Sequence, residues 1–457
     1  MKAMSLEEVS AATGASLVGE PGDAPVTGVS IDSRTVEPGD LFFALKGKTD
    51  GTRYAPDAMR AGAVGVVADR PLDGVPTLVD EDPLACLQRL AKWSLKETGK
   101  DGPRIVGITG TVGKTTTKDA LAAILRNAGK RAFATAGNFN NEIGLPLTVL
   151  AADPKTEYLV LEMGATHAGD ITKLCDIALP EVGILTAVSP VHLDSFGSLE
   201  SLAKAKGELA DCLPDSGTLV SPLEVPEAAT APGRTLARRI VFGVESGLLR
   251  ASEIRDTEDG LHFTVSYEGE SVEVRSPVFG THLVQPLLAA IGGGLALGLS
   301  LEECASGVGR IKRTGLRGEI FKLRDGITLY DDSYNASPAA MSAVLRYGAG
   351  QAAQREGRLV AVLGSMFELG PQTRAYHHEV GDTAAETGVD LLVCVGEEAR
   401  WYAESFTGEH LHYPDADSAA DGVAAALKPG DYVVIKGSRG VGLETLTRKL
   451  RESLPIV

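Results

Sequence analysis

Short apolar runs and helical patterns alternate along this chain, and their texture divides it into three segments. In residues 1 to about 100, apolar runs at 26–31 and 41–45 are separated by turn residues, and the charged, glycine-containing stretch 96–103 is typical of a linker. From 104 to about 314, short apolar strands are followed by helical patterns, which indicates a parallel sheet with crossover helices. The strands expected there lie at 105–106, 158–161 and 182–185.

A second alternating region begins at residue 315. Its four expected strands lie at 327–330, 359–363, 391–395 and 432–435. In open α/β sheets ligands collect at the carboxyl ends of the strands, so the loops after these runs are candidates for function. We therefore predict an α/β protein of three domains, at 1–100, 101–314 and 315–457.

Three further patterns refine the middle segment. Residues 261–277 alternate apolar and polar positions and predict a small antiparallel patch. Ser198 and Glu200 are typical of the cap and first turn of a helix over 199–213. The most apolar run, 284–299, has about helix length but contains four glycines, so we expect a buried, closely packed helix and no membrane insertion.

Composition narrows the class of protein. A chain of 457 residues is too long for one hydrophobic core, and 44% hydrophobic with 23% charged residues is ordinary for a soluble globular protein. The net charge of −17 opposes non-specific binding to nucleic acid, so we expect no nucleic-acid partner. The five cysteines are scattered without metal-binding spacing, and the first residues do not form a signal peptide. Both observations favour the cytoplasm.

One motif carries a specific chemical signal. Residues 107–117 read Gly-Ile-Thr-Gly-Thr-Val-Gly-Lys-Thr-Thr-Thr and lie between an apolar strand and a helical run over 118–127. Glycines in such a loop let backbone N–H groups surround phosphate oxygens, and the N-terminus of the following helix adds partial positive charge. Lys114 supplies a charge for the outer phosphates, and the Thr115 hydroxyl can bind magnesium. The expected phosphate-binding loop consists of Gly110, Thr111, Val112, Gly113, Lys114, Thr115 and Thr116.

Polar residues follow the strands next to this loop. Glu162 ends the run 158–161, where a carboxylate either binds magnesium or faces solvent. His192 follows the next strand, and it is either a ligand or a hydrogen-bonded structural residue. On the helix over 199–213, spacing alone singles out neither Lys204 nor Lys206, since surface lysines are usually solvated.

Three other runs offer polar groups to a ligand. Residues 137–144, Gly-Asn-Phe-Asn-Asn-Glu-Ile-Gly, are dense in amides, which suit a polar substrate or a turn held by Asn–backbone bonds. Residues 331–338, Asp-Asp-Ser-Tyr-Asn-Ala-Ser-Pro, place adjacent carboxylates at a strand end, where they can bind ribose hydroxyls or a cation. Residues 436–439, Lys-Gly-Ser-Arg, offer two cations to an anion.

Together and in this order, these segments resemble the Mur ligases of bacterial cell-wall synthesis over nearly the whole chain. The runs that carry the resemblance are 109–116, 138–146, 161–165, 192–200, 205–208, 331–338, 363–370 and 436–439. Two of them, 138–146 and 331–338, are particular to the branch that joins D-alanyl-D-alanine to UDP-N-acetylmuramoyl-tripeptide. The resemblance implies an N-terminal α/β domain for the UDP substrate, a central P-loop domain with a parallel sheet, and a C-terminal Rossmann-like domain.

The resemblance also implies a catalytic centre with ATP, two magnesium sites and CO2. Lys114 would contact the phosphates of ATP, and Thr115, Glu162 and His192 would bind magnesium. Lys206 would react with CO2 to form a carbamate that supports a magnesium ion.

Further implied contacts involve the N- and C-terminal domains and the asparagine-rich run 137–144. Arg317 would reach toward the phosphates, and Asp332 and Asn335 would hold the nucleotide. The residues assigned to the UDP-sugar-peptide substrate are Ser33, Arg34, Lys46, Asp50, Asn138 and Asn141.

The implied reaction is ATP-dependent amide-bond formation through an acyl phosphate, in a monomeric cytoplasmic enzyme of peptidoglycan synthesis, cell shape and cell division. A sister ligase that adds diaminopimelate usually carries an Asp-Asn-Pro-Arg run, which this chain lacks. A folylpolyglutamate synthetase would lack the run 137–144, and a simple P-loop kinase would not explain the N-terminal segment. A non-catalytic relative stays open, because Leu283, Gln285 and residues 440–443 depart from the family pattern in regions near adenine and the dipeptide.

Overall fold

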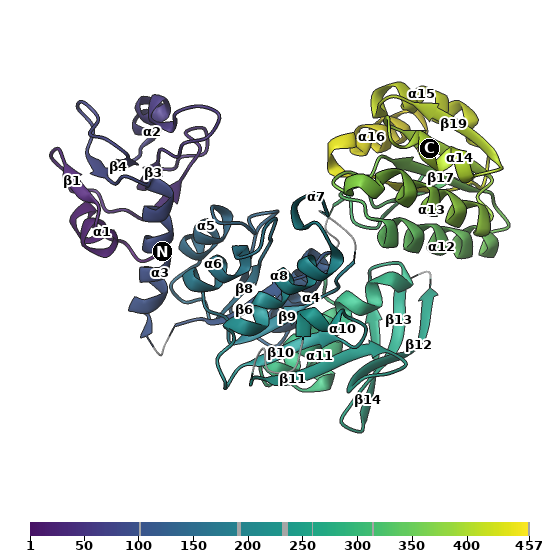
Figure 1. The fold of residues 1–457 in the computed structure, drawn as a ribbon, viewed down its shortest axis with the longest axis horizontal. Coiled ribbons are helices and arrows are strands. Elements are labelled where there is room, and N and C mark those ends of the chain that lie inside the picture. The colour runs from purple at the N-terminus through teal and green to yellow at the C-terminus, as the bar shows by residue number, and fades with distance from the viewer. Residues whose placement is uncertain (100–101, 190–192, 231–235, 258, 313–314, 456–457) are drawn as a thin grey trace.

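The computed structural model describes residues 1–99, 102–189, 193–230, 236–257, 259–312 and 315–455. These residues form three sheets of five, nine and six strands, which follow one another along the chain. In Figure 1 the N-terminal part (purple) and the C-terminal part (yellow-green) lie on either side of the central part (teal). The expected α/β class with parallel sheets is confirmed, whereas the domain boundaries at 100 and 314 stay predictions.

The N-terminal sheet has the strand order β1-β5-β4-β3-β2, with only β1 and β5 antiparallel. Its elements are α1 (Leu6–Thr13), β1 (Ser16–Val18), β2 (Gly28–Ser30), β3 (Asp40–Phe43), α2 (Ala55–Ala61), β4 (Gly65–Ala68), β5 (Thr77–Val79) and α3 (Pro83–Glu97). The expected linker at 96–103 begins too early, because α3 continues through Glu97. Asp82 caps this helix, and its buried Leu87 and Leu90 hold it against the domain core.

The central sheet has the order β14-β13-β12-β11-β10-β9-β6-β8-β7. Its strands are β6 (Arg104–Thr109), β7 (Ala132–Ala134), β8 (Tyr158–Glu162), β9 (Val182–Leu185), β10 (Thr218–Pro222), β11 (Arg238–Val244), β12 (Leu249–Thr257), β13 (Gly260–Tyr267) and β14 (Glu270–Ser276). Pairing is parallel from β7 to β12 and antiparallel from β12 to β14. The expected antiparallel patch is therefore confirmed, with β12 as a third strand.

The helices of this region are α4 (Lys114–Asn127), α5 (Gly144–Ala151), α6 (Asp170–Ile177), α7 (Leu193–Phe196), α8 (Leu199–Cys212), α9 (Glu227–Thr230), α10 (Val284–Ala296) and α11 (Leu301–Val308). The predicted cap of α8 is confirmed, since the Ser198 hydroxyl accepts from the Ser201 N–H. Helix α4 begins four residues before the predicted start, because the end of the phosphate-binding loop is already helical.

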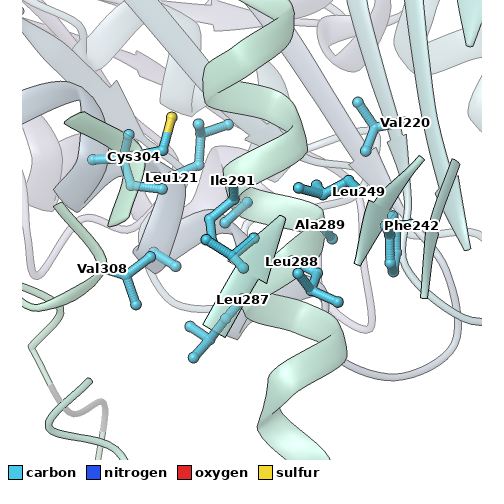
Figure 2. Close-up of a cluster of buried hydrophobic side chains, with 14 of the residues drawn as sticks. Leu121, Val220, Phe242, Leu249, Leu287, Leu288, Ala289, Ile291, Cys304 and Val308 are labelled. Atoms are coloured by element: carbon cyan, nitrogen blue, oxygen red, sulfur yellow. The ribbon is translucent and has the colours of Figure 1, made fainter. Parts of the chain in front are cut away.

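Helix α10 is the buried, closely packed helix expected from residues 284–299. Figure 2 shows its apolar side chains among those of α4, α11 and the sheet; the labelled ones are Leu121, Val220, Phe242, Leu249, Leu287, Leu288, Ala289, Ile291, Cys304 and Val308. A Cβ on Gly293 would lie 2.7 Å from Ile184 Cδ1, so glycine lets the helix approach the sheet. Within the described parts of the chain, no helix has the length and apolar character needed to cross a membrane.

The C-terminal sheet has the order β15-β16-β20-β17-β18-β19, and only the edge pair β15 and β16 is antiparallel. Its strands are β15 (Glu319–Lys322), β16 (Thr328–Asp331), β17 (Leu359–Gly364), β18 (Leu391–Val395), β19 (Glu409–Tyr413) and β20 (Tyr432–Lys436). The helices are α12 (Pro338–Gln354), α13 (Thr373–Glu386), α14 (Arg400–Ser405), α15 (Ala416–Ala426) and α16 (Leu443–Ser453). The four predicted strands match within one residue, and β19 was not predicted because no buried apolar run marks it.

Candidate active site

A cavity of about 840 Å³ lies between the central and C-terminal parts of the chain. Its walls are loops that follow β6, β7 and β8 on one side, and loops that follow β16, β17 and β20 on the other. The carboxyl ends of both parallel sheets therefore face one space, as expected for ligand sites in open α/β sheets.

The phosphate-binding loop forms one wall of this cavity. Gly110 has φ 141° and Gly113 has φ 87°, backbone conformations that side-chain-bearing residues rarely adopt. A Cβ on Gly110 would lie 2.1 Å from Thr186 Oγ1, so the loop needs glycine there. Lys114 Nζ donates to the Gly110 carbonyl at 2.8 Å and to the Thr111 carbonyl at 3.3 Å. Burial lowers the pKa of Lys114, and the charge of Glu162 opposes that shift.

Glu162 joins this loop to the asparagine-rich run. The Thr115 hydroxyl donates to Glu162 Oε2 and the Asn140 amide donates to Glu162 Oε1, each at 2.9 Å. The Glu162 side chain is buried, so the alternative of a solvent-facing carboxylate at the strand end does not hold in this structure. A hydroxyl and a carboxylate side by side next to a phosphate loop are oxygen ligands of the kind that Mg²⁺ takes together with substrate phosphates.

The structure separates the two lysines of α8. Lys204 is exposed and pairs with Glu200 at 2.7 Å. Lys206 is buried and lines the cavity, and its Nζ donates to the Ala165 carbonyl at 3.1 Å. Burial, reinforced by the positive charge of Lys114, lowers the pKa of Lys206 to about 7. A buried amine of this pKa is partly neutral near pH 7 and therefore nucleophilic.

His192 lies outside the described residues. Among the described residues, no three His, Cys, Asp or Glu side chains gather closely enough to hold a metal ion by themselves. A magnesium ion here would therefore depend on oxygens such as those of Thr115, Glu162 and the substrate.

The opposite wall contributes a charged cluster from the C-terminal part. Lys436 Nζ lies 2.5 Å from Asp332 Oδ2 and 2.8 Å from the Asn335 carbonyl oxygen. The Arg317 guanidinium lies 3.9 Å from the centre of the Tyr334 ring. All of these residues line the cavity, so the structure brings Arg317, Asp332 and Asn335 to the side facing Lys114.

The adjacent carboxylates of Asp331 and Asp332 have different surroundings. Asp331 is buried away from the cavity lining, and its Oδ1 accepts the Ser333 backbone N–H at 3.0 Å. Burial raises the pKa of Asp331. Only Asp332 faces the cavity, so the expectation of a paired-carboxylate site does not match this geometry.

The three asparagines of the run 137–144 differ in exposure and in hydrogen-bond partners. Asn138 is exposed on the cavity wall. Asn141 lies on the same wall, but its Oδ1 accepts the backbone N–H groups of Ile143 and Gly144 at the start of α5. Asn140, which sequence reasoning did not single out, is the asparagine that binds Glu162.

The other four residues assigned to the UDP-sugar-peptide substrate lie in the N-terminal part and do not line this cavity. Arg34 is exposed and pairs with Asp32 at 2.5 Å. Lys46 pairs with Asp69 at 2.7 Å, and Asp50 pairs with Arg70 at 2.8 Å. Ser33 lies next to Arg34 on the same loop and is half-buried. These residues form a second polar region that is separate from the phosphate loop.

His282 was missed as a cavity residue. It lines the cavity, and burial lowers its pKa to about 4, so the ring is neutral at physiological pH. Its Nδ1 has no hydrogen-bond partner among the described residues. The sequence signal for this residue is a histidine just before the buried helix expected at 284–299.

Family models and known proteins match nearly the whole chain. The models are the Mur ligase family catalytic domain over 25–83, the Mur ligase middle domain over 108–294, and the Mur ligase glutamate ligase domain over 316–439. The UDP-N-acetylmuramoyl-tripeptide--D-alanyl-D-alanine ligase of Bacillus subtilis is 34% identical over an alignment of 439 positions, which covers 94% of each chain. The enzyme of the same name from Mycobacterium tuberculosis is 37% identical over an alignment of 465 positions, which covers 92% of this chain and 91% of that one.

Solved structures agree with this match. A crystal structure of MurF from Acinetobacter baumannii superposes with a TM-score of 0.91 at 28% identity, over 99% of both chains. MurF ligase from Thermotoga maritima, in complex with ADP, superposes with a TM-score of 0.82 at 28% identity, over 93% of this chain and 97% of that one.

Proposed function

Because this chain belongs to the Mur ligase family, we propose that it joins D-alanyl-D-alanine to UDP-N-acetylmuramoyl-tripeptide at the expense of ATP. The observation that supports this most is the shared cavity, in which Lys114, Glu162 and Lys206 face Arg317 and Asp332. A simple kinase needs only groups that bind a nucleotide, such as Lys114 and Glu162. A ligase must hold a nucleotide, a carboxylate and an amine in one place.

Two chemical steps follow from this proposal. The terminal carboxylate of the tripeptide attacks the γ-phosphorus, which forms an acyl phosphate and releases ADP. The amine of D-alanyl-D-alanine then attacks the acyl carbon, and phosphate leaves. Both partners in the first step are anions, so cationic groups must offset their repulsion and the charge of the transferring phosphoryl group.

Lys114 is placed to supply part of that charge. In this structure its ammonium is bound to the Gly110 and Thr111 carbonyls, inside the loop that would surround the phosphates. Arg317 on the opposite wall is a second cation, and its guanidinium is oriented by the Tyr334 ring. We propose that Asp332 and Asn335 hold the nucleotide from the same wall.

The residues present fit magnesium. Thr115 and Glu162 offer adjacent oxygens beside the phosphate loop, and we propose that they hold one ion, with His192 serving a second site. A bound magnesium ion would neutralise phosphate charge and polarise the phosphoryl group. The contribution of this chain is the fixed orientation of Glu162, which its bonds to Thr115 and Asn140 provide.

Lys206 fits a carbamate. A carbamate needs a neutral amine, and the lowered pKa of Lys206 provides one near pH 7. The modified side chain would carry a negative charge and so support a cation near Lys114. We propose that CO2 modifies Lys206, whereas Lys204 on the same helix stays an ordinary surface ammonium.

The substrate and setting complete the proposal. We assign Ser33, Arg34, Lys46 and Asp50 to the UDP end of the substrate and Asn138, with Asn141 beside it, to its peptide end. Since the reaction consumes ATP, we place the protein in the cytoplasm, and we expect it to act as a monomer.

The test is phosphate release from ATP with magnesium, UDP-N-acetylmuramoyl-tripeptide and D-alanyl-D-alanine, with each component omitted in turn. Release that needs both peptide substrates, together with a product of the mass of the pentapeptide, supports the proposal. Release without the dipeptide would favour a sister ligase. Absence of turnover in folded protein would favour a non-catalytic relative.

A further inference from the structure

Helices α6 and α8 meet along a polar and sulfur-containing contact that the proposed reaction does not use. The Glu208 carboxylate on α8 contacts the first turn of α6. It accepts the Gly169 N–H at 2.6 Å, and the Thr172 N–H and hydroxyl at 3.1 Å each. Glu208 thereby satisfies free N–H groups at the start of α6 and fixes the two helices against each other.

Two cysteines continue this contact one turn farther along. Cys212 is four residues after Glu208 on α8, and Cys175 is three residues after Thr172 on α6. Residues at these spacings share a helix face, so the same faces that meet through Glu208 and Thr172 also bring the two sulfurs together. The two thiols are neighbours whose pKa values influence each other, both side chains line one groove, and Cys175 Sγ lies 3.9 Å from Met163 Sδ.

The sulfur pair opens to solvent on one side. Both cysteines line a groove of about 540 Å³ that is separate from the nucleotide cavity. Cys175 is buried, whereas Cys212 is partly exposed. Lys92 and Lys96 of α3 also line the groove. A small polar oxidant can therefore reach the partly exposed Cys212 more readily than the buried Cys175.

Cys212 differs in acidity from the other cysteines of the chain. The hydrogen bond from Cys175 lowers the pKa of Cys212, although partial burial and the charges of Asp211 and Glu208 oppose that shift. The pKa of Cys175 is raised, chiefly by its bond to Cys212. Burial raises the pKa of Cys86, Cys304 and Cys394 to about 11 or 12, and these three have no thiol partner in the described structure. Cys212 therefore has more thiolate character than they have.

We propose that Cys175 and Cys212 form a redox-modification site that a hydroperoxide converts to a disulfide between α6 and α8. The Cys212 sulfur attacks the peroxide O–O bond, which forms a sulfenic acid at Cys212 and releases an alcohol, or water from hydrogen peroxide. The Cys175 sulfur then attacks the Cys212 sulfur and releases water. Two thiols lose two electrons and two protons, and the peroxide gains both.

This site depends on the fold and not on the proposed ligase reaction, so its test needs no substrate. Full-length reduced protein is titrated with hydrogen peroxide, quenched, and analysed by intact mass and by peptide mapping. We expect a loss of two hydrogen atoms in mass, a cross-linked peptide pair containing Cys175 and Cys212, and full reversal by dithiothreitol. We expect Cys212 to react at least about tenfold faster than Cys86, Cys304 or Cys394.

Cys212→Ser is the matched variant, because Cys212 is partly exposed and its replacement leaves the buried core intact. Its circular dichroism should equal that of the wild type, and Cys175 in it should stay a thiol. Cys175→Ser should instead stop at the Cys212 sulfenic acid, which a dimedone probe traps. The proposal is overturned if wild-type Cys212 oxidises without a link to Cys175. It is equally overturned if the disulfides join two copies of the chain, or if Cys212 reacts no faster than the three buried thiols.

Discussion

Lys206 should bind CO2 at a pH where an ordinary lysine cannot. Its pKa falls from the ordinary 10.5 to about 7, because burial and the nearby Lys114 charge disfavour the ammonium form. Above about pH 7 the amine is therefore mostly neutral, and below it the amine is mostly protonated. At pH 8 the neutral fraction is about 90%, against about 0.3% for an unperturbed lysine, a ratio of about 300.

The assay uses ¹³C-labelled bicarbonate and carbon NMR of the carbamate signal, at constant dissolved CO2. The rate of carbamate formation should rise about tenfold from pH 5 to pH 6 and level off above about pH 7.5. Lys206→Met should abolish the signal, whereas Lys204→Met on the same helix should keep it, since Lys204 is exposed and paired with Glu200. A signal that survives Lys206→Met, or a rate that climbs without a plateau beyond pH 9, would refute this reasoning.

Other substitutions test the contacts of the site and of the fold. Thr115→Val and Glu162→Gln should each lower the rate of phosphate release at least about tenfold. Because the two side chains share one hydrogen bond, the double variant should lower the rate by less than the product of the two single effects. Single effects that multiply in steady-state kinetics would contradict this. Gly293→Val should destabilise the central part by about 1–3 kcal/mol by overpacking, seen as a lower denaturant midpoint, and an unchanged midpoint would contradict the close approach of α10 to the sheet. Tyr330→Phe removes a 3.2 Å hydrogen bond from β16 of the C-terminal part to the Phe279 carbonyl of the central part, and it should lower the free energy of unfolding by about 1–3 kcal/mol. An unchanged transition temperature in calorimetry would contradict this.

Local signals in the sequence were enough for the phosphate loop and for most strands. The spacing of Gly110, Gly113 and Lys114 is itself the physical requirement for a phosphate site, so no distant residue is needed to recognise it. The buried strands of the central and C-terminal parts are short apolar runs, and they were placed almost correctly for the same reason. Strand β19 lacks such a run and was therefore not predicted. Helix α3 ends in charged residues that also suit a linker, so its end was assigned to the linker.

Contacts between residues far apart in the sequence could not be predicted from local sequence patterns. The choice of Asn140 over Asn138 as the partner of Glu162 depends on how two loops meet. Asp331 ends β16 and is buried, whereas Asp332 follows the strand and lines the cavity, and this difference depends on how the strand end packs in the fold. Lys206 is an exception, because Leu202 and Leu209 at helical spacing place it on the buried face of α8, and this signal was present in the sequence.

The transfer of an oxygen atom tests the central claim most directly. The tripeptide substrate is prepared with ¹⁸O in its terminal carboxylate, and phosphate released during turnover with ATP and D-alanyl-D-alanine is analysed by mass spectrometry. Attack of the carboxylate on the γ-phosphorus predicts one ¹⁸O atom in each released phosphate. Phosphate that carries no label, while ATP is consumed, would contradict an acyl phosphate and with it the proposed ligase mechanism.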